Sequence, residues 1–148
     1  MRLLLQRVSR AEVRVSGRVV GAIGPGVAVL VGVGHDDTPE ITDALAAKCV
    51  DLRIFRDEEG RTNRSLIEVG GQLLAVSQFT LYADTRKGRR PSFLDAAPPV
   101  LGEELYERFA RAVEERGVTV ARGQFGQMMD VELVNDGPFT IFLDSAAG

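Results

Sequence analysis

The hydrophobic and polar positions near the start of the chain predict three strands. Residues 3–15 alternate imperfectly between apolar and polar side chains, which is typical of a long, partly exposed strand. Ser16-Gly17 is a turn signal, so residues 18–23 are expected to return as the second strand of a hairpin. Residues 27–33 are almost continuously apolar, the pattern of a strand that is buried on both faces.

Two later segments have helical spacing. The first follows Thr38-Pro39, where the hydroxyl suits the capping position and the proline suits the first turn. Its apolar stripe consists of Ile41, Leu45, Cys49 and Leu52. The second helix ends at Arg116-Gly117, a basic last turn with a glycine stop. Its apolar positions are Leu101, Leu105, Phe109, Ala112 and Val113. We therefore interpret Cys49 as a core residue.

Short apolar runs between and after these helices predict five more strands. Residues 56–60 are a cluster of turn residues that should follow the first helix. Strands are expected at residues 66–69, 73–79, 118–122, 128–134 and 139–143, the first two as a hairpin around Gly70-Gly71. Residues 82–99 have no sustained period, and a loop of this length in a compact domain is usually functional or disordered.

The elements follow in the order ββ-βα-ββα-βββ, which places the chain in the mixed α/β class. Two amphipathic helices could cover a strongly curved sheet, although an α+β sandwich fits the same periodicity. The length of 148 residues fits one domain, residues 1–148, with a real core.

Charge and hydropathy narrow the function classes. The net charge of −3 argues against a protein that coats nucleic acid non-specifically, because such proteins are usually basic. No apolar run approaches the roughly 18 residues of a membrane span. Residues 1–7 also reach charge too soon for a signal peptide. We therefore expect a cytoplasmic protein without a membrane or DNA partner.

One local cluster of cations runs against the overall acidity. Arg86, Lys87, Arg89 and Arg90 lie within five residues of the sequence. Such a charge run is often only a solvated loop. Contact with an anionic substrate is the other interpretation, and it stays open.

The chain offers few conventional catalysts. It contains one histidine and one cysteine, and His35 next to Asp36 lacks the spacing that would align a base with its orienting group. No His, Cys or carboxylate pattern has metal-ligand spacing, and no nucleophile elbow is present. We therefore expect neither a metal nor another cofactor, and chemistry that relies on hydroxyl, amide and backbone groups.

The hydroxyl and amide groups gather at one strand end, in Ser77-Gln78-Phe79-Thr80. In a strand, Gln78 and Thr80 face the same side and could line one pocket. They could equally satisfy exposed backbone groups at the strand end. Thr80 as a nucleophile would need an adjacent base, and the sequence shows none nearby.

Two stretches carry a family resemblance. Ser77-Gln78-Phe79-Thr80-Leu81 and Asn135-Asp136-Gly137-Pro138-Phe139-Thr140 resemble, residue by residue, the two signature motifs of the D-aminoacyl-tRNA deacylases. The similarity continues at Gln6-Arg7-Val8, Arg53-Ile54-Phe55 and Arg90-Pro91-Ser92-Phe93. The chain departs from the family pattern at Phe139, where a smaller β-branched residue is common.

The resemblance implies a fold, a reaction and an assembly. The fold is a barrel-like mixed sheet with two helices, and the assembly is a homodimer. The reaction is proofreading hydrolysis of the ester in D-aminoacyl-tRNA, and of glycyl-tRNA, through Ser77, Gln78, Phe79 and Thr80. The vicinal ribose hydroxyl of the substrate takes the place of a side-chain base.

The resemblance also implies how chirality is read. A Gly137-cis-Pro138 pair, braced by Arg7, projects its carbonyls into the pocket of the neighbouring subunit. These carbonyls accept from the α-ammonium and exclude an L side chain. Phe125 and Met129 resemble positions near the terminal nucleotide. Two other functions stay open on the residues alone: a nucleic-acid-binding module without turnover, and a broad small-ester hydrolase that uses Thr80.

Overall fold

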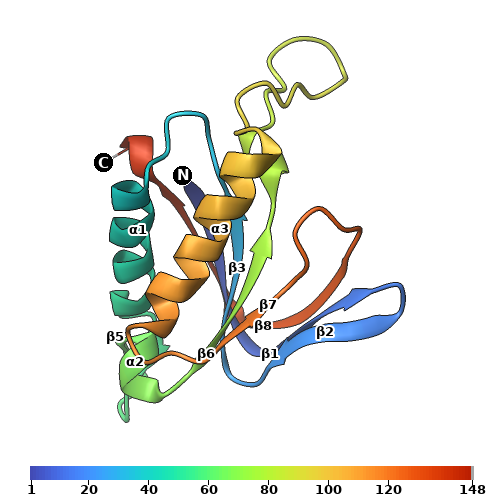
Figure 1. Cartoon of the computed structure of the whole chain (residues 1–148). Coiled ribbons are helices and arrows are strands. Elements are labelled where there is room, and N and C mark those ends of the chain that lie inside the picture. The colour runs from blue at the N-terminus through green and yellow to red at the C-terminus, as the bar shows by residue number, and fades with distance from the viewer. Residues whose placement is uncertain (148) are drawn as a thin grey trace.

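The computed structural model describes residues 1–147, which form a strongly curved mixed sheet with helices along one side (Figure 1). The sheet order is β2-β1-β3-β6-β7, and β8 pairs with the free edge of β1. β3 and β6 are parallel, as are β6 and β7, whereas β1 is antiparallel to its neighbours. The strands are β1 (Arg2–Val15), β2 (Arg18–Ile23), β3 (Gly26–Gly32), β6 (Gln72–Ser77), β7 (Val120–Arg122) and β8 (Asp130–Asp144).

The sheet curls until its outer strands approach each other. Gly21 of β2 lies so close to β7 that an added Cβ would be 2.6 Å from the carbonyl oxygen of Arg122. β1 is long enough to pair with two strands along the same edge. Its residues 2–8 pair with β3, and its residues 11–15 pair with β2. The expected barrel-like mixed sheet is confirmed.

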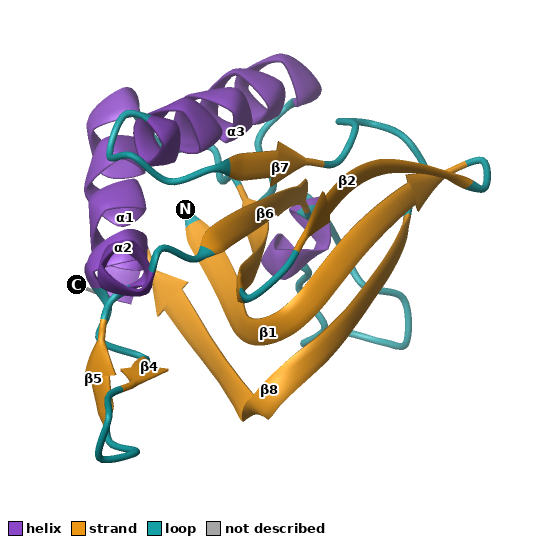
Figure 2. Cartoon of the chain, turned by 90° about the horizontal axis from the view of Figure 1, so that it is seen from below, coloured by secondary structure: helices purple, strands orange, loops and turns teal. Residues whose placement is uncertain are grey.

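The helices α1 (Pro39–Asp51) and α3 (Pro99–Glu114) lie next to each other against the sheet (Figure 2). The predicted start of α1 is confirmed, since the Thr38 hydroxyl accepts from the backbone N–H of Ile41 at 3.2 Å. The main core lies between these helices and the sheet, and Tyr106 of α3 donates from its buried hydroxyl to the Ala75 carbonyl at 2.8 Å. A second apolar cluster, which includes Val8, Val13 and Leu74, fills the curl of the sheet.

A third, short helix replaces one predicted strand. Residues 66–69 form α2 (Leu66–Val69) rather than half of a hairpin. The Ser65 hydroxyl accepts from the Glu68 N–H at 3.2 Å, and Gly70 ends the helix at φ +64°. Four residues are too few for periodicity to separate a helix from a strand. The predicted turn at residues 56–60 is confirmed and joins the small strands β4 (Phe55–Arg56) and β5 (Thr62–Arg64).

β6 ends earlier than its apolar run predicts. The strand stops at Ser77, and the next residues form the 3-10 turn η1 (Phe79–Tyr82). Leu81 lies over Gly32 of β3, where an added Cβ would be 2.9 Å from the Leu81 Cβ. The chain therefore turns because β3 leaves room for Leu81, a tertiary contact that strand propensity does not contain.

The last two predicted strands are one strand with an interruption. Gln6 of β1 pairs with Thr140 of β8, while Val8 pairs with Asn135. The four residues 136–139 therefore lie opposite Arg7 alone, and we call them the 136–139 excursion. Among residues 1–147, no helix is long and apolar enough to cross a membrane.

Candidate active site

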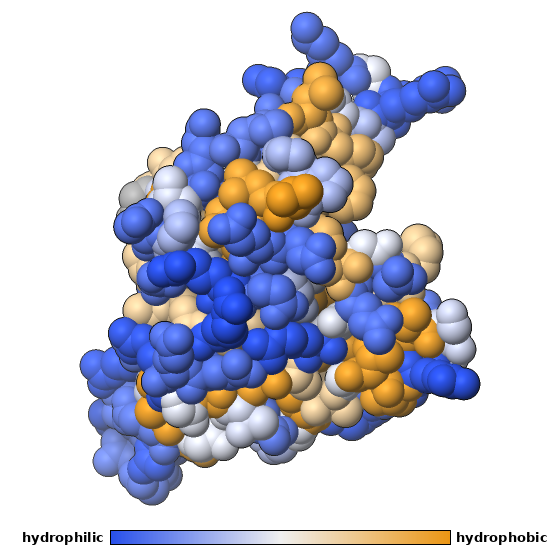
Figure 3. Space-filling view, in the orientation of Figure 1, coloured by the Kyte–Doolittle hydropathy of each residue, from blue (hydrophilic) through white to orange (hydrophobic). Residues whose placement is uncertain are grey.

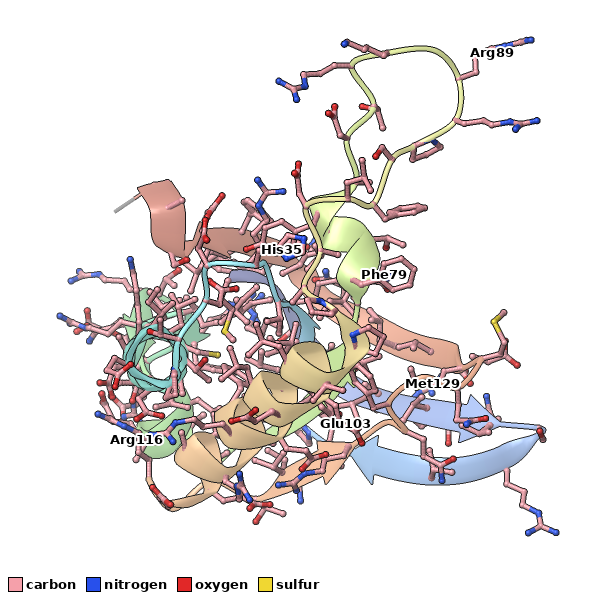
Figure 4. The ribbon with its side chains drawn as sticks, turned by 45° about the horizontal axis from the view of Figure 1, so that its top comes forward. His35, Phe79, Arg89, Glu103, Arg116 and Met129 are labelled. Carbon is pink, nitrogen blue, oxygen red and sulfur yellow. The ribbon has the colours of Figure 1, made fainter. Side chains whose placement is uncertain are left out.

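A cavity of about 600 Å³ opens beside the carboxyl end of β6. Three groups of residues form its wall: residues 76–79 at the end of β6 and the start of η1, residues 93, 96, 97 and 99 at and before the start of α3, and residues 125–129 and 131 around the start of β8. Figure 4 shows Phe79 below the base of a long loop and Met129 on the segment across from it. The wall is mainly apolar, with Ser77, Gln78 and Gln127 as its polar side chains.

The structure brings three of the four predicted catalytic residues to this wall. Ser77, Gln78 and Phe79 line the cavity, whereas Thr80 is exposed and is not one of the lining residues. The prediction that Gln78 and Thr80 share one face of a strand is wrong, because residues 79–82 form η1. The two side chains nevertheless meet, since the Gln78 amide donates to the Thr80 hydroxyl.

The first backbone groups of η1 are available to a ligand. Within residues 1–147, the N–H groups of Phe79 and Thr80 donate no hydrogen bond. The turn begins with Leu81, whose N–H donates to the Gln78 carbonyl at 3.2 Å. Two unpaired donors next to a cavity can bind an oxygen that gains negative charge during a reaction.

No ionisable side chain lines the cavity within the described residues. His35 is exposed, and its Nε2 lies 2.6 Å from the Leu94 carbonyl oxygen. Cys49 lies in the core, where burial raises the pKa of its thiol to about 12. The described part of the wall therefore contains no side-chain base, and its polar side chains are all neutral.

The 136–139 excursion is held by Arg7, which is 4% exposed. Its Nε donates to the Asp136 carbonyl at 2.9 Å and its Nη1 to the Ile54 carbonyl at 2.6 Å. The guanidinium also lies 4.6 Å from the centre of the Phe139 ring. Burial lowers the pKa of Arg7 from its ordinary value, Arg56 lowers it further, and Asp136 raises it.

Asn135 closes the excursion from the other side. Its Oδ1 accepts from the Phe139 N–H at 2.6 Å, and its Nδ2 donates to the Thr140 hydroxyl at 3.0 Å. The Gly137–Pro138 peptide bond is cis, and both residues are exposed. Neither residue lines the cavity of its own chain, so the structure does not unite the two predicted motifs within one subunit.

The predicted cations lie on a loop that projects from the body of the molecule. Asp84 and Ser92 pair through two backbone hydrogen bonds of 2.8 and 2.9 Å, and we call residues 84–92 the basic loop. The Arg86 guanidinium donates two hydrogen bonds to the Asp84 carboxylate. These bonds lower the pKa of Asp84 to about 2. Arg89 lies at the tip in Figure 4, far from the cavity wall.

A family model described as D-Tyr-tRNA(Tyr) deacylase matches residues 4–144 of the chain. The chain belongs to this deacylase family. A curated relative from Roseiflexus castenholzii, named D-aminoacyl-tRNA deacylase, is 60% identical over 146 residues, which cover 99% of this chain and 93% of the relative. One from Thermus aquaticus with the same name is 55% identical over 146 residues, covering 99% and 96%. The expected family is confirmed.

Two solved structures of similar length superpose on this chain over nearly its whole length. A c-Myc DNA unwinding element binding protein superposes with a TM-score of 0.92 at 37% identity, over 97% of this chain and 98% of that one. A probable eukaryotic D-amino acid tRNA deacylase superposes with a TM-score of 0.84 at 24% identity, over 96% and 97%. At that lower identity the likeness shows the fold alone.

Sequence reasoning missed part of the deacylase cavity. Phe125 and Met129 line the wall, and Met129 Sδ accepts from the Gln124 N–H at 3.4 Å; their place near a terminal nucleotide stays a prediction. Ala96, Ala97 and Met128 also line it, and neither apolar period nor chemistry singled them out. The missed residues belong to irregular segments, where the available signal was only the resemblance at Phe93 and the length of the unpatterned stretch before α3.

Proposed function

We propose that this deacylase hydrolyses the ester that joins a D-amino acid, or glycine, to the terminal ribose of tRNA. The cavity at the end of β6 carries this proposal, since its wall contains the family motif and no ionisable side chain. A neutral, largely apolar wall suits an activated ester, which needs orientation and charge stabilisation more than a strong base. Phe125 and Met129 offer apolar surface for the terminal nucleotide.

The reaction would use the substrate's own vicinal hydroxyl. Water adds to the ester carbonyl carbon, and the bond between that carbon and the ribose oxygen breaks. The vicinal hydroxyl would pass one proton of this water to the departing ribose oxygen, and the second proton would go to solvent as the free amino acid leaves as its carboxylate. The N–H groups of Phe79 and Thr80 are the donors for the developing oxyanion, and the Gln78 amide orients the Thr80 hydroxyl beside them.

The chiral filter would come from a second copy of the chain. Gly137 and Pro138 are exposed, their backbone is braced by Arg7 and Asn135, and they lie outside their own cavity. Their carbonyls in the partner's cavity would accept from the α-ammonium and leave no space for an L side chain. Glycine would pass because it has no side chain. A homodimer is therefore part of the proposal.

The basic loop would contact RNA phosphates. Lys87, Arg89 and Arg90 are exposed, and no carboxylate of residues 1–147 lies within ion-pair distance of them. Arg86 is already paired with Asp84 at 2.8 Å and contributes less free charge.

One comparison of substrates tests the function. D-aminoacyl-tRNA and L-aminoacyl-tRNA are prepared on the same tRNA, together with a D-substrate whose terminal ribose lacks the vicinal hydroxyl. We expect turnover of the first alone. Binding of all three without turnover would identify a nucleic-acid-binding module. Equal turnover of the third substrate would identify a small-ester hydrolase that uses Thr80.

A further inference from the structure

An apolar flank leads out of the cavity towards the basic loop. It consists of Phe79, Phe93 and Leu94, which are 55%, 39% and 83% exposed. The rings of Phe79 and Phe93 meet edge to face, with centroids 5.1 Å apart, and both residues also line the cavity. Leu94 lies beyond the wall. Figure 3 shows apolar side chains along this flank of the projecting arm, beneath a hydrophilic tip.

The backbone that presents Leu94 is fixed at several points. The Phe93 carbonyl accepts from the Ala96 N–H at 3.1 Å, and the Leu94 carbonyl oxygen lies 2.6 Å from His35 Nε2. The Ala97 N–H donates to the Val33 carbonyl of the body at 2.9 Å. The backbone of such a turn loses little freedom when a ligand covers its side chain, which lowers the entropic cost of binding there.

The charges beside the flank favour an anionic occupant at its outer end. Two acidic groups near the outer end of the flank, Asp84 and Asp95, both interact with Arg86. Lys87, Arg89 and Arg90 at the tip are left without an ion pair to residues 1–147. A ligand that leaves the cavity along this path therefore meets an apolar surface first and positive charge second.

We propose that the apolar flank binds the unpaired nucleotides that precede the terminal nucleoside of the RNA substrate. Their bases pack on Phe93 and Leu94, and the phosphates that follow reach the tip of the basic loop. The inference rests on the proposed function of the cavity. Apolar and aromatic side chains bind unpaired bases with little regard to sequence. Three side chains are far smaller than the roughly 1,200–2,000 Å² of a stable protein interface, which disfavours a second copy of the chain.

Kinetics on two substrates test the flank. Leu94→Ser is compared with Val19→Ser, a control on β2 that is 51% exposed and outside the cavity wall. For D-aminoacyl-tRNA, we expect Leu94→Ser to raise KM about fivefold without changing kcat. We expect Leu94→Phe to bring KM to the wild-type value or below. For a D-aminoacyl ester of adenosine alone, all variants should match the wild type.

Three different results for these variants would contradict the inference. An unchanged KM for tRNA in Leu94→Ser would overturn the inference. So would an equal change on both substrates, which indicates repacking of the cavity, or a changed sedimentation coefficient, which indicates a contact between copies.

A direct measurement of RNA binding tests the flank without relying on hydrolytic activity. The probe is an uncharged, fluorescently labelled single-stranded RNA that ends in the tRNA 3′ sequence, with a blunt RNA hairpin as its control. We expect Leu94→Ser to weaken binding of the single strand about fivefold and to leave hairpin binding unchanged. If the wild-type protein fails to hydrolyse D-aminoacyl-tRNA, the proposed function fails, and this measurement still decides the inference. Equal single-strand affinity in wild type and Leu94→Ser would overturn it.

Discussion

Arg7 is a buried cation that holds two backbone segments from distant parts of the chain. It donates to carbonyls of the 136–139 excursion and of Ile54, and it packs on the Phe139 ring. The resemblance pointed to Arg7, but its partners depend on the curl that places β1 beside both segments. A one-dimensional pattern contains no such distance, so these partners could not be predicted.

Removing the charge of Arg7 should destabilise the fold. In Arg7→Met the Asp136 and Ile54 carbonyls lose buried donors, and we expect the free energy of unfolding to fall by about 3 kcal/mol. Arg10→Met is the matched control on the same strand, where an exposed pair with Glu132 at 3.3 Å contributes less than about 1 kcal/mol. Urea denaturation measures both. Equal losses would show that Arg7 contributes no more to stability than an exposed charge does.

Gly137 has a second reason to be glycine besides its positive φ. An added Cβ would lie 2.8 Å from the Phe139 nitrogen and 3.2 Å from Arg7 Nη2. Gly137→Ala should therefore displace the excursion and lower D-substrate turnover by more than about tenfold. Gly60→Ala is the control, because Gly60 has φ +76° and open space around its Cα. Loss of activity in both variants would attribute the effect to general destabilisation.

Thr80 should act by position rather than as a nucleophile. Its hydroxyl accepts from Gln78, and the cavity wall offers no ionisable group to activate it. We expect Thr80→Ala to reduce kcat roughly ten- to hundredfold, as misplacement does, with Thr62→Ala of β5 as an unaffected control. Mass spectrometry of the enzyme during turnover checks the alternative. An aminoacyl adduct on Thr80 would contradict the positioning role.

At the scale of elements, the sequence predicted those helix starts and turns that depend on contacts between neighbouring residues. α1 begins at its predicted cap, and the turn at residues 56–60 is present, since both are specified within a few residues. The errors at α2 and η1 have different causes. α2 was too short for its period to be read, and η1 depends on the fit of Leu81 over Gly32.

The basic loop makes a prediction about salt. A plot of the logarithm of tRNA affinity against the logarithm of salt concentration has a negative slope. Replacing Lys87, Arg89 and Arg90 with glutamine should reduce the size of this slope by about 2, because each phosphate contact to a single strand contributes roughly 0.7. A control triple variant at Arg10, Arg18 and Arg61 changes the net charge equally on exposed positions away from the loop. Binding is titrated at several salt concentrations. The same change of slope in both variants would show that the loop acts only through the net charge of the protein.

At the scale of the molecule, each cavity should depend on its partner. If the chain forms the proposed dimer, a mixture of Gly137→Ala and Gln78→Ala chains would contain mixed dimers in which one cavity has an intact wall and an intact filter from the other chain. Random assembly should then recover about a quarter of wild-type activity from two impaired parents. Sedimentation is the check on whether dimers form. No recovery in mixed dimers, or full activity in a monomer, would place the filter within one chain.

The neutral wall of the cavity also determines which reagents can harm the enzyme. Thiol-alkylating, imidazole-modifying and carboxyl-activating compounds find no target among its lining residues, because Cys49 is buried and His35 lies outside. The two thioethers, Met128 and Met129, are the oxidisable side chains of the described wall, and Met128 is 90% exposed. Conversion to the sulfoxide would make this apolar surface polar. Because the described wall has no thiol, imidazole or carboxyl group, mild oxidation of its methionines is the chemical stress to which we expect this cavity to be most sensitive.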